Sequence, residues 1–196
     1  MPHAPVSILM ARMPGSEIGQ TLIPKAKRTA LAKLNLFLST IRGWKRPRGN
    51  EEVCSITGGA IRSVRVPRQT IAPCATPEEF HDYLLSAAWN SCDSEDVYEN
   101  RLRTARKLQE LQRPGVKFAH RDFEHHDILV DDEGYFHITG LIDWYPKFWE
   151  HTTALRFLQK DYWWYDCLMK LGGEQYLEES DCERALTNLT ADSLSW

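Results

Sequence analysis

The apolar positions in the first half of the chain recur at steps of three and four residues, the spacing that places side chains on one face of an α-helix. Three amphipathic helices are predicted, beginning after Pro24, at Thr76 and near Ser94, and the third is expected to end before Pro114. Thr76 and Glu79 form a capping-box pattern at the start of the second helix. The residues predicted to face the core are Leu31, Leu34, Leu38 and Ile41, then Phe80, Tyr83, Leu84 and Ala87, then Tyr98, Leu102, Ala105 and Leu108.

Shorter apolar runs, rich in β-branched and aromatic residues, predict strands. These runs lie at residues 6–10, 116–119, 128–130 and 136–142. Pro and Gly mark a turn at 13–16, and the acidic stretch 131–134 separates the last two runs, which predicts a β-hairpin. Residues 43–75 carry much of the glycine and proline and show no sustained period, so we expect a long, partly extended segment there.

Helical character returns after Pro146 and includes an unusually aromatic stretch. Helical spacing predicts that these aromatic side chains belong to the core, and a cage for a quaternary ammonium group is the alternative. They are Phe148, Trp149, Phe157, Tyr162, Trp163, Trp164 and Tyr165. Ser180 and Glu183 repeat the capping-box spacing and predict the start of a final helix. Cys167 and Cys182 are expected to be buried as small hydrophobic residues. The chain is therefore predicted to be one domain of the α+β class, mainly helical, over residues 1–196.

Composition excludes several classes of protein. The 196 residues include 24 Lys and Arg against 27 Asp and Glu, a net charge of -3, which argues against nucleic acid or an anionic membrane as the partner. Five widely spaced cysteines without a CxxC pair indicate neither a disulfide framework nor a zinc finger. No apolar run approaches the length of a membrane span, so a cytoplasmic protein is expected.

One segment is strongly basic despite the acidic balance of the whole chain. It holds eight basic residues and no acidic one: Lys25, Lys27, Arg28, Lys33, Arg42, Lys45, Arg46 and Arg48. Two interpretations stay open, a solvated helix face and a face that attracts phosphate.

The densest set of chemically capable side chains lies at residues 118–130. It comprises His120, Asp122, Glu124, His125, His126 and Asp127, and Asp143 follows at the end of the predicted hairpin's return strand. A loop that leaves one strand and a carboxylate that ends the next can converge on one point. Carboxylate oxygens, with room left for substrate and water, suit a divalent cation that bridges phosphate oxygens.

This cluster resembles the catalytic loop of the aminoglycoside phosphotransferase and choline kinase-like family. His120-x-Asp122-x-x-x-x-Asp127, followed by Ile-Leu-Val, is similar to the family pattern H-G-D-x-x-x-x-N with its apolar tail. The segment that ends in Asp143-Trp144 resembles the family's metal-binding I-x-D-W segment. Further similarity, to fungal members, lies at residues 8–15, 55–59 and 145–150.

The resemblance implies the hinge and the C-terminal lobe of a kinase-like fold, with the N-terminal lobe missing. Its parts would be a hinge strand and turn at 1–15, helices and a long loop at 16–115, the catalytic loop and metal-binding hairpin at 116–145, and C-terminal helices at 146–196. The implied activity is transfer of a phosphoryl group from ATP or GTP, with Mg²⁺, to a small hydroxylated substrate.

The resemblance also implies roles for individual residues. Asp122 matches the catalytic base that accepts a proton from the substrate hydroxyl, and Asp127 and Asp143 match the ligands of Mg²⁺. His120 is expected to be a structural residue of the loop. The nucleotide contacts would come from the hinge residues Met10, Arg12 and Met13.

Departures from the family pattern predict a truncated or degenerate phosphotransferase. Asp127 stands where the pattern has Asn, and Arg121 stands where it has Gly. The segment after Asp143 is shortened, and no Gly-rich loop or phosphate-binding lysine strand comes before residue 6. The alternative is a non-catalytic, pseudokinase-like protein whose exposed hinge face, around residues 8–10, binds a protein partner or a second copy of the chain.

A minor alternative uses the histidines of the cluster. Imidazoles and carboxylates together suit Zn, Mn or Fe, so a metal-dependent hydrolase is a further hypothesis. Its ligands would come from His120, Asp122, His125, His126 and Asp127.

Overall fold

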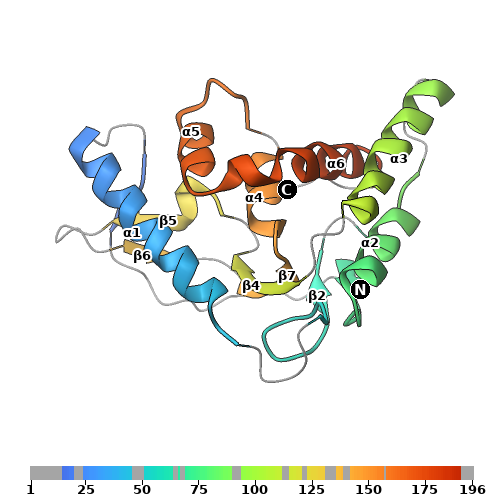
Figure 1. Cartoon of the computed structure of the whole chain (residues 1–196), viewed down its shortest axis with the longest axis horizontal. Helices are drawn as coiled ribbons and strands as arrows, with labels where there is room; N and C mark the ends of the chain where they lie inside the picture. The colour runs from blue at the N-terminus through green and yellow to red at the C-terminus, as the bar shows by residue number, and fades with distance from the viewer. Residues whose placement is uncertain are drawn as a thin grey trace, which may run out of the picture.

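The computed structural model of the chain is an α+β structure, with six α-helices and three small antiparallel sheets among the residues that it describes (Figure 1). Those residues are 15–19, 24–45, 51–63, 66, 69–89, 94–111, 115–120, 123–130, 136–138, 142–156 and 158–190. The predicted α+β class is confirmed.

The three N-terminal helices form where the apolar spacing predicts them. They are α1 (Pro24–Arg42), α2 (Pro77–Ser86) and α3 (Glu95–Glu110). Oγ1 of Thr76 accepts a hydrogen bond from the backbone N–H of Glu79 at 3.2 Å, which confirms the cap of α2. Tyr83 departs from its predicted stripe, because it is exposed and its hydroxyl donates to the carbonyl of Thr70. Of the predicted core positions, eight are buried: Leu34, Leu38, Ile41, Phe80, Leu84, Leu102, Ala105 and Leu108. Leu31, Ala87 and Tyr98 are half-buried.

The predicted β-hairpin is present. Its strands pair antiparallel, with Val130 opposite Phe136, and a short N-terminal strand joins them to give the order β1-β5-β6. The three strands are β1 (Ser16–Glu17), β5 (Ile128–Val130) and β6 (Phe136–Ile138). The predicted turn at 131–134 and the predicted strand at 6–10 lie outside the described residues.

The return strand of the hairpin differs from the prediction. The apolar pattern predicts one run over residues 136–142 with Asp143 at its end, but the structure has β6 and then a separate strand, β7 (Ile142–Pro146). β7 pairs antiparallel with β4 (Val116–His120) in a second sheet.

Within the predicted extended segment at residues 43–75, the part that the structure describes holds short strands and turns and no α-helix. It contains a small sheet of two strands, β2 (Ile61–Arg62) and β3 (Thr70–Ile71). Isolated bridges join Val53 to Cys74 and Cys54 to Trp144. The second bridge fixes residue 54 beside β7, which matters for the site below.

The C-terminal part contains α4 (Trp149–Leu155), α5 (Trp163–Lys170) and α6 (Leu177–Thr187). The predicted start of the last helix at Ser180 is wrong, because α6 begins at Leu177 and Ser180 is buried inside it. A 3-10 turn, Gly173–Tyr176, runs directly into α6 and sets its start. Gly172 ends α5 with a φ of 102°, a left-handed conformation that glycine adopts without strain.

Aromatic side chains fill the core around α4. The ring of Trp149 stacks on Tyr145 and meets the edge of Phe80, with centroids 5.0 Å apart in both pairs. Trp164 is fully buried, while Tyr162 and Trp163 are half-buried. The described cysteines are buried, as expected for Cys167 and Cys182.

In Figure 1, α1 lies on one side of the molecule and α2 and α3 lie on the other, with β4, β7 and α4 between them. α6 packs against both α3 and α4. Of the helices described, none combines the length and the apolar character needed to cross a membrane.

Candidate functional site

The pairing of β4 with β7 puts Asp143 beside the end of β4. Asp143 stands opposite Ala119, and His120, the last residue of β4, stands opposite Ile142. The chain leaves β4 at this point toward Asp122, so Asp143 lies next to the start of that segment. Asp122 itself lies outside the described residues, as do the predicted nucleotide contacts Met10, Arg12 and Met13.

Asp143 is buried and holds a turn of the preceding chain. It is 9% exposed, and its Oδ1 accepts a hydrogen bond from the backbone N–H of Ile56 at 3.0 Å. Ile56 belongs to a tight turn at residues 55–59. The bridge before this turn is made of two backbone hydrogen bonds between Cys54 and Trp144, of 3.1 and 2.9 Å. The carboxylate of Asp143, which is predicted from the sequence to bind metal, therefore also holds the turn at residues 55–59, which is distant in the sequence.

Asp127 lies in a 3-10 turn, His125–Asp127, that leads directly into β5. Its backbone N–H donates to the carbonyl of Glu124 at 3.1 Å, and its Oδ2 lies 3.8 Å from Nε2 of His126. The Asp127 side chain is 22% exposed, which makes it more accessible than Asp143. The two predicted magnesium ligands thus belong to different parts of the fold, because Asp127 lies in the turn before β5, the central strand of the three-stranded sheet, and Asp143 lies in β7 of the β4-β7 pair.

His120 ends β4 against a buried polar network. Its ring is fully buried and meets the edge of Phe123, with centroids 5.8 Å apart. Its backbone N–H donates to Oε2 of Glu150 at 3.4 Å, and Oε1 of Glu150 forms an ion pair with Arg42. Nη2 of Arg42 also lies 2.6 Å from Nε2 of His151. The network joins the end of α1 and the start of α4 to His120, the first residue of the predicted catalytic loop.

Burial controls the protonation of this network. Burial raises the pKa of Glu150, while the charge and hydrogen bond of Arg42 act in the opposite direction. Burial first, and the Arg42 charge second, lower the pKa of His151 to about 3. His151 is therefore neutral and accepts from Arg42 through Nε2, which assigns its own proton to Nδ1, a buried atom without a hydrogen-bond partner.

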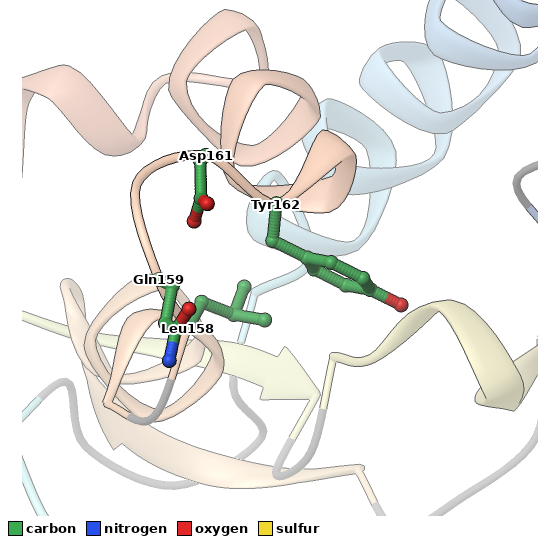
Figure 2. A pocket seen from close by; sticks show the side chains of 4 residues that line it. All are labelled: Leu158, Gln159, Asp161 and Tyr162. Atoms are coloured by element: carbon green, nitrogen blue, oxygen red, sulfur yellow. The ribbon is translucent and has the colours of Figure 1, made fainter.

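A hollow lies beside the 3-10 turn. The hydroxyl of Tyr162 lies 2.8 Å from Nε2 of His125, and burial, followed by the nearby His126, lowers the pKa of His125. Tyr162 also borders the hollow, which has a volume of about 380 Å³. The lining residues are Leu158, Gln159, Asp161 and Tyr162 (Figure 2). In Figure 2 the carboxylate of Asp161 points toward Gln159, while the ring of Tyr162 extends away from them.

Carboxylate oxygens are typical ligands of magnesium, whereas imidazoles are typical ligands of transition metals. Mg²⁺ is usually held by one or two carboxylates together with substrate phosphates and water, and Asp127 and Asp143 supply such oxygens. Within the described part of the chain, no group of three or more His, Cys, Asp or Glu side chains is placed to hold a metal ion. His125 faces Tyr162, and the ring of His120 packs against Phe123. The described histidines therefore give no support to the alternative of a metal-dependent hydrolase.

The buried role of Arg42 was missed at the level of sequence. Arg28 and Lys33 of the basic segment are exposed, as a solvated face requires, but Arg42 turns inward to Glu150. The helical period carried a signal, because Arg42 follows Leu34 and Leu38 at steps of four residues and so continues the apolar stripe. A charge on such a stripe needs a buried partner or a route to solvent.

Comparison with known proteins gives no relative: no protein-family model, curated protein or solved structure matches this chain. The resemblance to the aminoglycoside phosphotransferase and choline kinase-like family therefore stays a prediction, which rests on the sequence motifs alone.

Proposed function

We propose that this chain is a small-molecule phosphotransferase of the kinase-like type, which transfers the terminal phosphoryl group of ATP or GTP to a hydroxyl group of a small acceptor. The observation that supports this most is the register of β4 and β7. It puts Asp143 opposite Ala119, at the strand end from which the segment with Asp122 departs. Phosphoryl transfer needs a metal-binding carboxylate and a base within one site, and this strand end offers a place for both.

In this proposal the carboxylates divide the chemical work. Asp122 accepts the proton of the acceptor hydroxyl while the hydroxyl oxygen bonds to the terminal phosphorus, and the bond to the bridging oxygen breaks to release the nucleoside diphosphate. Asp127 and Asp143 would hold Mg²⁺, which when bound supplies positive charge to the phosphate oxygens. Asp127, in place of the neutral Asn of the family pattern, adds negative charge to the site and weakens the attraction for the nucleotide.

A second function, that of a non-catalytic binding protein, is favoured by one observation. Asp143 already accepts a hydrogen bond from Ile56 and is 9% exposed, so it serves the fold as a cap for the turn at residues 55–59. A protein without catalysis would keep Asp143 for this reason alone. The hinge face at residues 8–10, which would bind the partner, lies outside the described residues.

Transfer of label from terminally labelled ATP and GTP to a panel of small hydroxylated compounds tests the phosphotransferase proposal. The wild type is expected to label at least one acceptor in the presence of Mg²⁺. Asp122→Asn removes the base and should reduce the rate by roughly a hundredfold to ten-thousandfold. Asp143→Asn should also lose activity, whereas Asp166→Asn, on the exposed face of α5, is the matched control and should keep it.

The opposite results favour the binding protein. Label that reaches no acceptor would contradict the proposed chemistry. So would transfer that proceeds equally well in the Asp122→Asn and Asp143→Asn variants, because the activity would then come from another site or another protein.

A further inference from the structure

We infer that the turn at residues 55–59 is a positioning element of the candidate metal site, in which the backbone N–H of Ile56 orients the carboxylate of Asp143 for metal binding. This inference rests on the proposed function. The turn at residues 55–59 belongs to the long segment at residues 43–75 and carries no charged side chain, and the inference gives this turn a role.

The turn is closed by hydrogen bonds within itself. The N–H of Ser55 donates to the carbonyl of Gly59 at 3.0 Å, and the N–H of Gly58 donates to the carbonyl of Ser55 at 2.9 Å. The N–H of Gly59 donates to Oγ of Ser55, also at 2.9 Å. Gly58 has a φ of 82°, so the segment matches a three-residue hairpin loop, in which a β-turn is followed by a left-handed residue. This closure gives the N–H of Ile56 a fixed direction.

The turn is also attached to the strand that carries its target. The paired hydrogen bonds of Cys54 and Trp144 lie one residue before the turn and one residue after Asp143. The donor and the acceptor are therefore held on neighbouring segments, and the 3.0 Å bond from Ile56 to Oδ1 sets the rotation of the Asp143 carboxylate. Outer-shell hydrogen bonds of this kind orient metal ligands, and their loss typically costs tenfold to a hundredfold in metal affinity.

The side chain and the N–H of Ile56 do different things. The side chain is 61% exposed, so the core does not depend on it, whereas the N–H points inward to Asp143. A substitution that removes the N–H can therefore be compared with one that removes only the side chain.

Ile56→Pro removes this N–H and is compatible with the turn. Ile56 is the second residue of the turn, a position where proline is favoured. Its φ is negative, since Gln69 is the only non-glycine residue with a positive φ in the described part of the chain. Ile56→Ala keeps the N–H and is the matched control.

The readout is the affinity of the folded protein for Mn²⁺ in the presence of ATP, measured by titration calorimetry. Mn²⁺ serves as the probe for Mg²⁺ because both prefer oxygen ligands. Ile56→Pro should weaken Mn²⁺ binding roughly tenfold to a hundredfold, Ile56→Ala should bind like the wild type, and Asp143→Asn should lose binding. A merely structural role of the turn would lower the melting temperature of Ile56→Pro without changing this affinity.

The outcomes separate the two proposals. If Asp143→Asn loses Mn²⁺ and Ile56→Pro binds it like the wild type, the positioning inference is wrong and the proposed function stands. If the wild type binds no Mn²⁺, or binds it no better than Asp143→Asn, the proposed function fails and the inference fails with it. Should Ile56→Pro not fold, Ser55→Ala removes the Oγ that accepts from Gly59 and loosens the turn. Unchanged Mn²⁺ affinity in Ser55→Ala would then overturn the inference.

Discussion

The ion pair between Arg42 and Glu150 leads to a stability prediction with a defined pH dependence. Arg42→Met removes the cation that faces a carboxylate with a side chain only 1% exposed. Breaking a buried ion pair from one side costs roughly 3–5 kcal/mol, because the remaining charge stays buried. We expect a loss of that size in the free energy of unfolding at pH 8. For a chain of this size, it corresponds to a fall of roughly 6–20 °C in Tm.

The loss is expected to shrink at pH 5. Burial raises the pKa of Glu150 above the ordinary value of a glutamate, and Arg42 acts against this rise, so removal of Arg42 raises the pKa further. An acid with a raised folded pKa favours the folded state below its unfolded pKa, and this contribution is lost as pH rises through the folded pKa. As the pH falls and Glu150 takes up a proton, its carboxyl group needs no cation, and the Arg42→Met variant avoids much of its penalty.

His151 also makes the difference in stability between the wild type and the Arg42→Met variant smaller at low pH. Its pKa is lowered from 6.5 to about 3, so the stability of the wild type falls as pH falls below 6.5. Arg42 contributes to that lowering, and its removal relieves part of the loss. In the wild type, Glu150 and His151 change the free energy of unfolding with pH in opposite directions, and the two effects partly cancel. The difference in the free energy of unfolding between the wild type and the Arg42→Met variant is therefore the quantity to measure.

Urea unfolding of the wild type and the variant at pH 5 and pH 8 measures the effect. Arg28→Met removes the same kind of side chain from the exposed face of α1, and this control should change stability by no more than about 0.5 kcal/mol. The reasoning would be refuted by an Arg42→Met loss below about 1 kcal/mol at pH 8, where the buried-pair cost should be largest. An equal loss at both pH values would also refute it, since Glu150 would then not titrate between them.

Four further predictions concern other parts of the fold. Tyr162→Phe removes the hydroxyl beside His125 and should cost about 1 kcal/mol in the free energy of unfolding. Burial lowers the pKa of His125, so an NMR titration should place this pKa below 6.5. The unfolded chain then takes up the proton before the folded chain does, so the free energy of unfolding should decrease as the pH falls below 6.5. An unshifted pKa of His125 would contradict this prediction. Gly173→Ala would put a Cβ 2.8 Å from the carbonyl oxygen of Leu168 and should cost roughly 1–3 kcal/mol in urea unfolding, and an unchanged midpoint would show that the turn relaxes freely. Burial is the main cause that raises the pKa of Cys74 and Cys182 to about 11, so both should resist iodoacetamide at pH 8 until the chain is unfolded, and their modification in native buffer, detected by peptide mapping, would contradict that burial.

Elements with local signals were predictable from the sequence. The apolar stripes of α1, α2 and α3 and the cap at Thr76 belong to stretches of fewer than two dozen residues, and the structure has them where the pattern predicts. The start of α6 was not predictable in this way, because the 3-10 turn before it, rather than the side chain of Ser180, begins the helix. The division of the return segment into β6 and β7 depends on β4, a strand that local patterning does not identify as the partner.

The candidate site follows the same distinction. His120, Asp127 and Asp143 could be singled out because they lie in motifs that resemble a known family. The contacts around Asp143 and His120 are long-range, because Ile56 and Asp143 lie 87 residues apart and Arg42 and Glu150, which contacts His120, lie 108 apart. No periodicity or spacing rule predicts such pairs, and only the placement of Arg42 on an apolar stripe gave a hint of one.

A thermal melt with Mg²⁺ and nucleotide tests the central claim most directly. The wild type should melt cooperatively, and only Mg²⁺ together with ATP or GTP should stabilise it. At a hundredfold excess over Kd the gain is about 2.7 kcal/mol, or roughly 5–10 °C for a chain of this size. Asp166→Asn should show the same rise in Tm, and Asp143→Asn should show none. A wild-type melt that ignores Mg²⁺ and nucleotide, or a rise of equal size in Asp143→Asn, would contradict the account of this chain as a phosphotransferase with Asp143 in its metal site.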